Sequence, residues 1–544
     1  MQTTICPGKG PEAATLALKL VEWNFGPLCK RVVKSLVHHG RQSLKELRST
    51  SELKKDALQL ALMVLIQQNC VDVNVQPLSP SGKEEYTYEA NIPRILQIIR
   101  IPLFLHIIDH VLPKEHREVK KIVLQTLFHH GRMTVDQIVE HALQSSSSTE
   151  DVLRDCIRDL VHRRLIERAP LCSLPPAPDT VHVRAQKRRS ANRSHDDEEE
   201  GANLIARARE RRNQSSLRFC WDMNEDDASE SKRMKKKRKY EEMENASSAV
   251  LWRVNFEECN RRLYNSLAID LFEKHVGGAS RKVVEAILYA DEQEAELSDG
   301  GVAPIMHDSS FVSQQDLLKA SKEIHAVHLK ASDIKEVLEA CRDHDAGDAV
   351  LTAHGKSLPP LSSCIQTNGN IRFRTTEALR IARHLSLLAI IEQRFGSSAR
   401  RVWNMLYLGG QMEQKAIATE SMLHNGEARE VLYAMLRNGF VTLQDVPRNA
   451  DRAPSRTFYT WRAPLDMATI RATIMLYRTA NNLLSRMAHE TSTNSELLRR
   501  VHLVNQGRMD ASQLNASQLH KLKATVRITE SALIDIESQI AIFS

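Results

Sequence analysis

The sequence predicts a mainly α-helical protein, built from tandem winged-helix modules and ending in an antiparallel coiled-coil hairpin. Three observations support this fold class: an internal repeat, a β-hairpin pattern in the C-terminal third, and two long runs of heptad spacing. At 544 residues the chain is too long for one core. A typical domain size of about 150 residues implies roughly three to five units.

The internal repeat starts with two histidines, a glycine and an arginine. Residues 38–47 (HHGRQSLKEL) recur as residues 129–138 (HHGRMTVDQI). In each copy we expect a helix to stop at the glycine and a capping box to begin the next helix, which is how a helix-turn-helix starts. The capping pairs are Ser43 with Glu46 and Thr134 with Gln137.

Each copy continues with a longer apolar-periodic helix and then with a β-type run. The helices are predicted at 54–68 and 149–163, and the β-runs at 71–75 and 165–166. A second β-run at 85–89 completes a wing in the first copy.

A third copy of the same frame lies further along the chain. Phe395-Gly396 matches Phe25-Gly26 of the first copy, Gly410 is the helix stop, and 431–437 belongs to the third helix. The copies are visible without any reference to other proteins.

Two short β-type runs follow this third copy. Residues 441–446 and 456–461 favour a pleated surface and are joined by a turn that contains proline and aspartate. They predict the wing of the last winged helix. Phe458, Tyr459 and Trp461 are assigned to the core rather than to base stacking.

The residues around this wing resemble the C62-type subunit of eukaryotic RNA polymerase III. The resemblance rests on Arg-Phe-Gly within Glu392–Arg401, on Ala-Pro-Ser-Arg-Thr-Phe-Tyr within Val446–Trp461, and on the heptad helices that follow. It is close over 385–480 and recognisable over 16–100. In that family several winged helices lead into a coiled coil.

The resemblance implies a non-catalytic subunit in a peripheral heterotrimer. Its implied partners are a second winged-helix subunit, an acidic-tailed subunit, the clamp of the largest subunit, TFIIIB and promoter DNA. The implied role is recruitment through TFIIIB, DNA opening and initiation for transfer RNA, 5S ribosomal RNA and other short transcripts in the nucleus. In animals the same enzyme is implicated in sensing AT-rich cytosolic DNA, so a part in innate immunity is a further expectation.

The family pattern also implies a module in the middle of the chain. Helices are predicted at 251–272, 281–289, 313–318 and 332–341, with a wing strand at 371–374. The predicted organisation is winged helix 1 at 1–95, winged helix 2 at 96–171, a disordered charged linker at 172–248, winged helix 3 at 249–376, winged helix 4 at 377–464 and a coiled-coil hairpin at 465–544.

The linker prediction rests on charge and on a lack of apolar residues. Basic and acidic runs alternate at 187–189, 196–200 and 232–239, and such a segment buries too little surface to offset its ordering entropy. The last run predicts a nuclear localisation signal, and the alternative is an arm that binds nucleic-acid phosphates. The basic residues of that run are Lys232, Arg233, Lys235, Lys236, Lys237, Arg238 and Lys239.

The C-terminal hairpin follows from two apolar seams. One seam runs from Ile470 to Ala488 and the other from Leu519 to Ile540, both at spacings of three and four residues. A glycine-containing stretch at 505–511 separates them. Facing seams joined by a loop predict an antiparallel coiled coil.

Candidate DNA contacts are the arginines of the last wing, Arg448, Arg452 and Arg456, where a winged helix often meets a phosphate. The alternative is that they are solvated turn charges or ion-pair with neighbouring aspartates. Lys54 and Lys55 at the start of the third helix of module 1 are further candidates.

No catalytic, cofactor or metal site is predicted. The stretch 347–357 ends like a phosphate loop but has its glycines too far apart, and His489-Glu490 lacks the second histidine of a metalloprotease helix. The doubled histidines fit helix C-termini better than metal ligands. The chain is therefore expected not to be an enzyme, although its family belongs to a nucleotidyltransferase complex.

Composition sets wider limits. A net charge of +7 permits nucleic-acid contact without requiring it, and nine cysteines without a close pair predict reduced thiols. The apolar run 58–66 is far shorter than the roughly 20 residues of a membrane span, so no membrane contact is expected.

Two rival functions remain open. One is a free-standing winged-helix transcription factor or chromatin adaptor, although 57–69 and 428–438 offer few Arg, Asn or Gln side chains for base reading. The other is a scaffold of the proteasome-lid or signalosome type, which would require helical solenoid repeats upstream.

Overall fold

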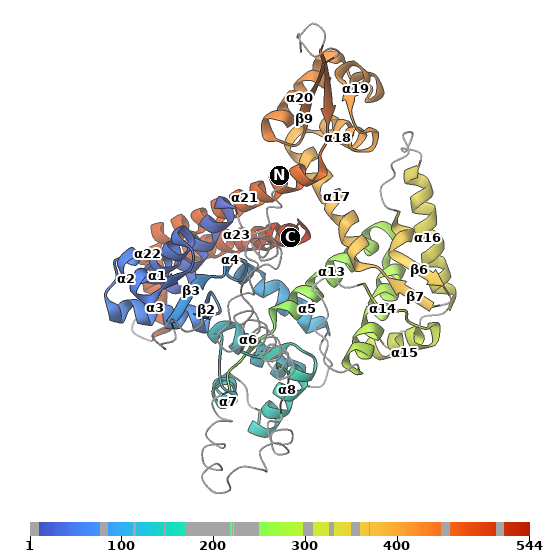
Figure 1. Ribbon diagram of the computed structural model, residues 1–544. Helices are drawn as coiled ribbons and strands as arrows, with labels where there is room; N and C mark the ends of the chain where they lie inside the picture. The colour runs from blue at the N-terminus through green and yellow to red at the C-terminus, as the bar shows by residue number, and fades with distance from the viewer. Residues whose placement is uncertain are drawn as a thin grey trace, which may run out of the picture. The chain divides into compact units, whose positions relative to one another are not determined.

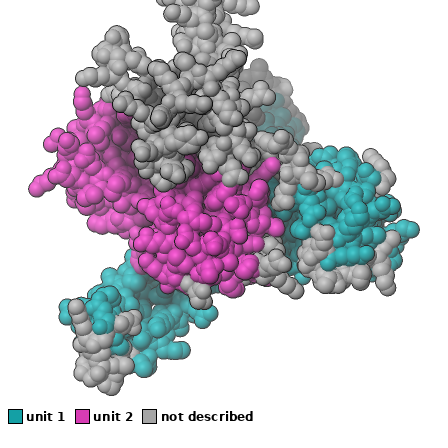
Figure 2. Space-filling model, turned by 90° about the horizontal axis from the view of Figure 1, so that it is seen from below, with its two compact units in different colours: residues 1–16, 260–544 teal, residues 17–259 magenta. Residues whose placement is uncertain are grey.

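The computed structural model is mainly α-helical, with small sheets (Figure 1). It describes residues 10–76, 85–111, 116–145, 148–169, 218–219, 221, 250–297, 308–325, 331–349, 360–368, 370–447, 457–506 and 516–543. The chain divides into two compact units, residues 17–259 and residues 1–16 with 260–544 (Figure 2). Each unit is described separately below.

The first winged helix has the predicted order of elements. They are α1 (Pro11–His39), β1 (Gln42–Ser43), α2 (Leu44–Ser51), α3 (Lys55–Gln67), β2 (Val71–Gln76) and β3 (Glu85–Ala90), with sheet order β1-β3-β2. The predicted capping box is confirmed, because the Ser43 N–H donates to Glu46 Oε2 at 2.8 Å and the Glu46 N–H donates to Ser43 Oγ at 3.5 Å. Leu47 of α2 and Leu58 and Leu65 of α3 are fully buried in the core of this module.

The second winged helix repeats this plan. Its elements are α4 (Ile92–Leu96), the 3-10 helix η1 (Gln97–Arg100), α5 (Ile101–Val111), α6 (Arg117–His130), α7 (Val135–Ser145), α8 (Glu150–His162), β4 (Ile166–Arg168) and β5 (Trp252–Val254). Thr134 and Gln137 form the second predicted capping box, with reciprocal bonds of 3.1 and 3.4 Å.

The wing of the second module is closed by a strand from far along the chain. β4 pairs antiparallel with β5, and Met133 forms a bridge to Trp252 on the other side of β5. The charged segment 172–248 therefore lies between the two strands of one wing. The helix predicted at 251–272 is wrong at its start, because residues 252–254 satisfy their backbone groups in this sheet.

The middle region forms a helical module with a two-stranded sheet. Its elements are α13 (Phe256–Val276), α14 (Gly278–Leu297), α15 (Gln314–His325), α16 (Ala331–Ala349), η3 (Leu361–Cys364), β6 (Ile365–Asn368) and β7 (Asn370–Phe373). The wing strand predicted at 371–374 corresponds to β7. Phe272 and Phe373 meet edge to face in the core, with ring centroids 5.4 Å apart.

The last winged helix is built from α17 (Thr375–Phe395), α18 (Ser397–Gly409), β8 (Met412–Glu413), α19 (Gln414–Glu420), α20 (Asn425–Asn438), β9 (Thr442–Pro447) and β10 (Thr457–Arg462), with sheet order β8-β10-β9. α17 crosses the predicted boundary at 376/377. Its Ala378, Ile381 and Ala382 pack in the core of the middle module.

Equivalent backbone positions recur at the ends of the third helices. Asn69, Arg164 and Gly439 follow α3, α8 and α20 with φ of 57°, 59° and 78°. In each case the next backbone N–H donates to the carbonyl five residues before it, at 2.8, 3.0 and 3.0 Å. This shared turn sets the direction of the outer wing strand in all three modules.

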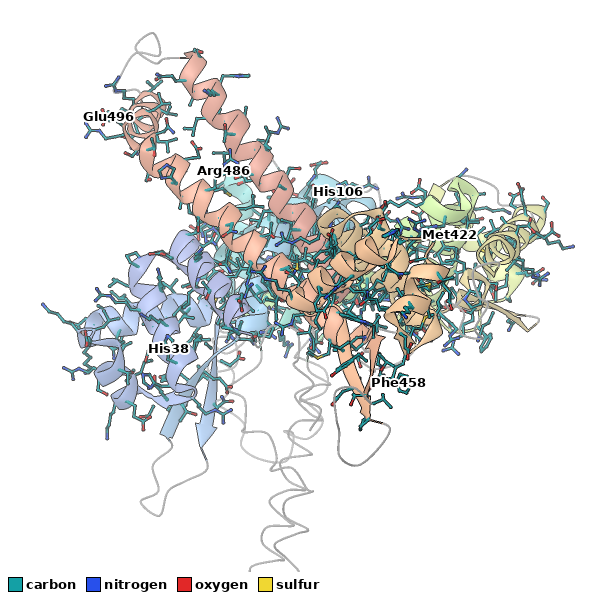
Figure 3. All side chains as sticks on the ribbon, turned by 90° about the horizontal axis from the view of Figure 1, so that it is seen from above. His38, His106, Met422, Phe458, Arg486 and Glu496 are labelled. Carbon is teal, nitrogen blue, oxygen red and sulfur yellow. The ribbon has the colours of Figure 1, made fainter. Side chains whose placement is uncertain are left out.

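Two long helices, α21 (Leu465–Thr493) and α23 (Ala516–Phe543), lie side by side after the last wing (Figures 1 and 3). A short helix, α22 (Ser495–Asn505), follows a break at Asn494. Leu484 of α21 and Leu533 and Ile540 of α23 are buried, as the two seams predict, whereas Ile470 is half-buried and Ala488, at the end of the first seam, is exposed.

Candidate nucleic-acid and partner interfaces

The candidate wing arginines Arg448, Arg452 and Arg456 lie outside the described residues. The strands on either side are described, and they pair from Thr442 with Arg462 to Pro447 with Thr457. The predicted β-hairpin is thus confirmed. The roles of the three arginines stay a prediction.

The aromatic residues of this wing divide into buried and exposed. Trp461 is 2% exposed, and its ring lies 5.4 Å from that of Tyr433, so its assignment to the core is confirmed. Phe458 is 38% exposed and Tyr459 is 48% exposed, and their assignment to the core is wrong. The reason is positional, since Phe458 lies on the part of the hairpin that projects from the module (Figure 3), whereas Trp461 is covered by Tyr433 of α20.

A buried hydrogen bond fixes the base of the wing. Trp403 of α18 is fully buried, and its Nε1–H donates to the carbonyl oxygen of Phe440 at 3.1 Å. Phe440 in turn meets Phe395 edge to face, with ring centroids 5.6 Å apart. The Arg-Phe-Gly run therefore contributes directly to the position of β9.

Lys54 and Lys55 lie at the beginning of α3 and are exposed. Lys54 occupies the N-cap position without a side-chain capping bond. Two ammonium groups at the positive end of a helix dipole make this end attractive to an anion. DNA contact by these two lysines stays a prediction.

The exposed face of α3 also carries an apolar cluster of three side chains, although Gln59 and Gln67 are exposed on the same helix. Leu60 is 60% exposed and Met63 is 58% exposed, with Val64 beside them. Base reading in a DNA groove depends on hydrogen-bonding side chains, which these residues lack. This face is better suited to protein contact.

The third helices of the other two winged modules expose mixed charges. On α8, Arg154 contacts Glu150 at 2.8 Å and Asp136 at 2.9 Å, and the hydrogen bonds that Arg154 donates to these carboxylates raise the pKa of Arg154. On α20, Glu427 and Glu430 alternate with Arg429 and Arg437. Neither helix offers the uniformly basic face that phosphate binding favours.

A buried carboxylate that sequence reasoning missed ties the second module together. Glu167 is 1% exposed, and its Oε1 accepts from Arg253 Nε at 2.8 Å while its Oε2 accepts from Arg218 Nε. Burial lowers the pKa of Arg218, but Glu167 and Glu257 outweigh it and the net shift is upward. Arg218 belongs to the predicted linker, so residue spacing gave no signal for this contact.

The doubled histidines lie where helices end. His38 and His39 close α1, and His129 and His130 close α6. His130 stacks on His141 at 4.4 Å, and burial lowers the pKa of His130. Within the described part of the chain, no three His, Cys, Asp or Glu side chains are grouped to hold a metal ion.

Two further sequence predictions concern localisation and membranes. The basic run Lys232–Lys239 lies outside the described residues. Among the helices that the structure describes, none has both the length and the apolar character to cross a membrane.

Comparison with known proteins matches two parts of the chain to domain families. Residues 15–73 match the RNA polymerase III subunit RPC82 helix-turn-helix domain, and residues 387–463 match the POLR3C C-terminal winged-helix domain. These ranges correspond to the first and last winged helices.

Similarity to individual proteins extends over nearly the whole chain. It is 23% identical over 533 residues to the DNA-directed RNA polymerase III subunit RPC3 of Rattus norvegicus, covering 94% of this chain and 91% of that protein. It is 22% identical over 534 residues to RPC3 of Homo sapiens, with the same coverage. To rpc3 of Emericella nidulans it is 33% identical over 180 residues, which are 32% of this chain and 29% of that protein.

These matches agree with the order of winged helices in the structure. The chain thus resembles the RNA polymerase III subunit RPC3 over nearly its whole length, and its first and last winged helices match domain families of RNA polymerase III subunits.

Proposed function

We propose that this chain is a non-catalytic subunit of DNA-directed RNA polymerase III. The observation that carries the proposal is similarity to RPC3 proteins over 94% of the chain, together with the first and last winged helices at the matched ranges. The structure supports a role in binding, since the described third helices offer apolar or mixed-charge faces to partners.

In this proposal the chain acts at promoter recruitment through TFIIIB, at DNA opening and at initiation. Its partners are the clamp of the largest subunit, a winged-helix subunit and an acidic-tailed subunit of one heterotrimer, and its location is the nucleus. The transcripts are transfer RNA, 5S ribosomal RNA and other short RNAs. A role in sensing cytosolic DNA in animals is a separate consequence of the same resemblance.

Transcription by polymerase with and without this subunit tests the proposal. Promoter-dependent transcription of a transfer-RNA gene should fall when the subunit is removed and return when purified full-length chain is added back. Elongation from a preformed scaffolded template should change much less, because that template bypasses recruitment and opening. Normal initiation without the subunit would refute the role.

The wing arginines are tested by the combined change Arg448→Glu, Arg452→Glu and Arg456→Glu. If they contact phosphates, DNA association weakens, and each lost contact lowers the logarithmic salt slope by about 0.7 to 0.9. Binding is measured by titration at several salt concentrations. An unchanged slope would assign these arginines to solvent or to ion pairs.

A charge-matched control removes the same number of exposed cations elsewhere in the module. It combines Lys415→Glu, Arg429→Glu and Arg437→Glu. If this variant loses as much slope as the wing variant, the effect reflects net charge and not contact by the wing.

A further inference from the structure

The outer wing strands of the second and last modules are equivalent position by position. Each follows the shared turn after the third helix, whose turn residue is Arg164 in the second module and Gly439 in the last. Arg168 of β4 and Leu443 of β9 each lie four residues after that turn residue. Arg168 pairs with Trp252, and Leu443 pairs with Trp461. The two tryptophans therefore occupy the same place in the two wings.

In the second module the outer edge of β4 is already covered by another segment of the same chain. The Arg168 N–H donates to the carbonyl oxygen of Arg218 at 3.0 Å. Nearby, Trp221 lies against Trp252 with ring centroids 5.5 Å apart, and the guanidinium of Arg158 on α8 lies over Trp221. A short segment thus adds to the strand edge and packs an aromatic ring between helix and wing.

The direction of the backbone N–H and C=O groups on the outer strand follows from the hydrogen bonds that its partner strand makes on the opposite side. The backbone of Trp252 exchanges two hydrogen bonds with that of Met133, at 2.7 and 3.0 Å. The backbone N–H and C=O groups of its neighbour on β4, Arg168, therefore point away from β5. Trp461 pairs with Met412 of β8 in the same register. The N–H and C=O groups of the residue opposite Trp461 therefore point away from the sheet.

In the last module these outward groups belong to Leu443 and Asp445. β9 is the edge strand of its sheet, and no backbone hydrogen bond joins these two outward N–H groups to another part of the described chain. Pro447, which has no N–H, occupies the next outward position, where proline is tolerated on an edge strand. Among the residues that the structure describes, none covers this edge over the stretch that precedes the wing tip.

Exposed apolar side chains lie along this edge, among the polar side chains of Thr442, Gln444 and Asp445. Leu443, Val446 and Tyr459 are all more than one third exposed on the hairpin. Tyr433 of α20 is also exposed, and it stands at the position that Arg158 holds on α8. An unpaired strand edge beside apolar side chains is the surface to which extended peptides add as a further strand.

We propose that the outer edge of β9 binds an extended segment of a partner protein as an additional β-strand. The partner places an apolar or aromatic side chain against Tyr433 and Leu443, which are the equivalents of Arg158 and Arg168. In the second module Trp221 lies against Arg158, whereas in the last module Tyr433 itself contacts Trp461, the equivalent of Trp252.

The chemistry of the edge selects a polypeptide. Only a peptide backbone supplies donors and acceptors at the spacing of Leu443 and Asp445, whereas a nucleic-acid phosphate cannot donate to outward carbonyl groups. The Asp445 carboxylate also disfavours a polyanion. The inference concerns a protein contact and stands whether or not the chain acts in initiation.

Hydrogen exchange at single-residue resolution tests the proposal on the full chain. We compare the purified chain with the native complex that contains it, isolated from nuclei. The amides of Leu443 and Asp445 should exchange at least about tenfold more slowly in the complex. The amide of Arg168 should be slow in both samples, because Arg218 already covers it.

Four outcomes would overturn the proposal. Equal exchange in both samples would mean that nothing adds to the edge. Slow exchange in the dilute purified chain would assign the edge to another segment of the same chain. Slowing that appears only on concentrating the chain would indicate a second copy, and slowing that requires added duplex DNA would indicate nucleic acid.

The change Leu443→Pro removes an outward N–H and leaves the bonds between β9 and β10 in place. It should abolish the slowing at Asp445 in the complex, whereas Leu443→Ala, which keeps the N–H, should retain most of it. Slow exchange of the Trp461 amide reports that the wing is folded. If the proline variant loses that signal, Asp445→Lys blocks the edge by charge without altering the backbone, and it should prevent the slowing at Leu443.

Discussion

Gly26 and Gly396 adopt the same backbone conformation in two different modules. Their φ and ψ angles are 87° and 177° for Gly26 and 91° and 173° for Gly396. Each follows a phenylalanine and separates two helices of a winged-helix module. This region of backbone space is essentially restricted to glycine, so the Phe-Gly pair encodes a bend.

Gly396→Ala should therefore destabilise the last winged helix by about 1 to 3 kcal/mol. The penalty is backbone strain alone, because no atom lies within 4 Å of the added Cβ. Native-state hydrogen exchange of the β10 amides measures the local stability. Gly426→Ala is the control, since Gly426 lies in α20 without positive φ, and it should be neutral or stabilising by about 0.5 kcal/mol. Equal effects of the two changes would contradict the strain argument.

Another glycine, Gly131, lies where the second module touches the first. A Cβ on Gly131 would lie 2.2 Å from the backbone oxygen of Gln67, and the adjacent Arg132 N–H donates to that oxygen at 3.0 Å. Gly131→Ala should cost more than Gly40→Ala by about 1 to 3 kcal/mol. Gly40 has a similar positive φ but open space around its Cβ, so the difference isolates the overlap.

Exchange of the Arg132 amide is the direct measurement, because its hydrogen bond is the one displaced. It should be much faster in Gly131→Ala than in Gly40→Ala. If both variants exchange equally at this amide, the two modules tolerate a wider spacing than the structure shows.

Protonation of the buried His384 should lower the stability of the folded chain in mild acid. It is buried beside the rings of Trp403 and Tyr407, and burial lowers the pKa of His384 from 6.5 to about 4. Between these values the unfolded chain binds a proton that the folded chain excludes. The free energy of unfolding therefore keeps its full value above pH 6.5 and falls as the pH drops towards 4. Protonation of His384 lowers it by a total on the order of 3 kcal/mol.

Denaturant unfolding of the full chain across this pH range measures the effect. His384→Phe keeps a buried ring without a titrating group and should flatten the profile between pH 6.5 and 4. His38→Gln, at an exposed position, should leave the profile unchanged. A wild-type profile in the phenylalanine variant would show that another group causes the acid dependence.

The long helices after the last wing make a matched comparison possible. Leu484→Asp or Leu533→Asp places a charge at a buried contact and should lower stability on the order of 3 kcal/mol. Ile528→Asp, on the exposed face of α23, should change it by less than about 0.5 kcal/mol. Thermal unfolding followed by helical circular dichroism distinguishes them. Equal melting temperatures would mean that these seams do not pack as described.

Features with short-range causes could be predicted from the sequence. The Ser43–Glu46 and Thr134–Gln137 capping boxes depend on residues three apart, and both are present. The wing of β9 and β10 follows from β-forming residues on either side of a turn. Such interactions need no knowledge of the rest of the fold.

Features that depend on distant residues could not be predicted. Trp252 pairs with Arg168 across the charged segment, and no local pattern distinguishes this from the start of a helix. Phe458 and Tyr459 have the composition of core residues, yet their exposure depends on how far the hairpin extends beyond α20. For the candidate site, Lys54 and Lys55 are exposed as predicted, but surface exposure alone does not select a partner.

The pairing of β4 with β5 holds the two ends of the charged segment one strand spacing apart. A loop with fixed ends costs only about 0.6 kcal/mol more for each doubling of its length. Insertions or deletions within 172–217 or 222–248 should therefore leave every helix of the second module in place, whereas a change of charge at Arg218 removes a partner of buried Glu167. Mutation can therefore change the length and charge of these two stretches of sequence while the pairing of β4 with β5, which joins their outer ends, stays constant.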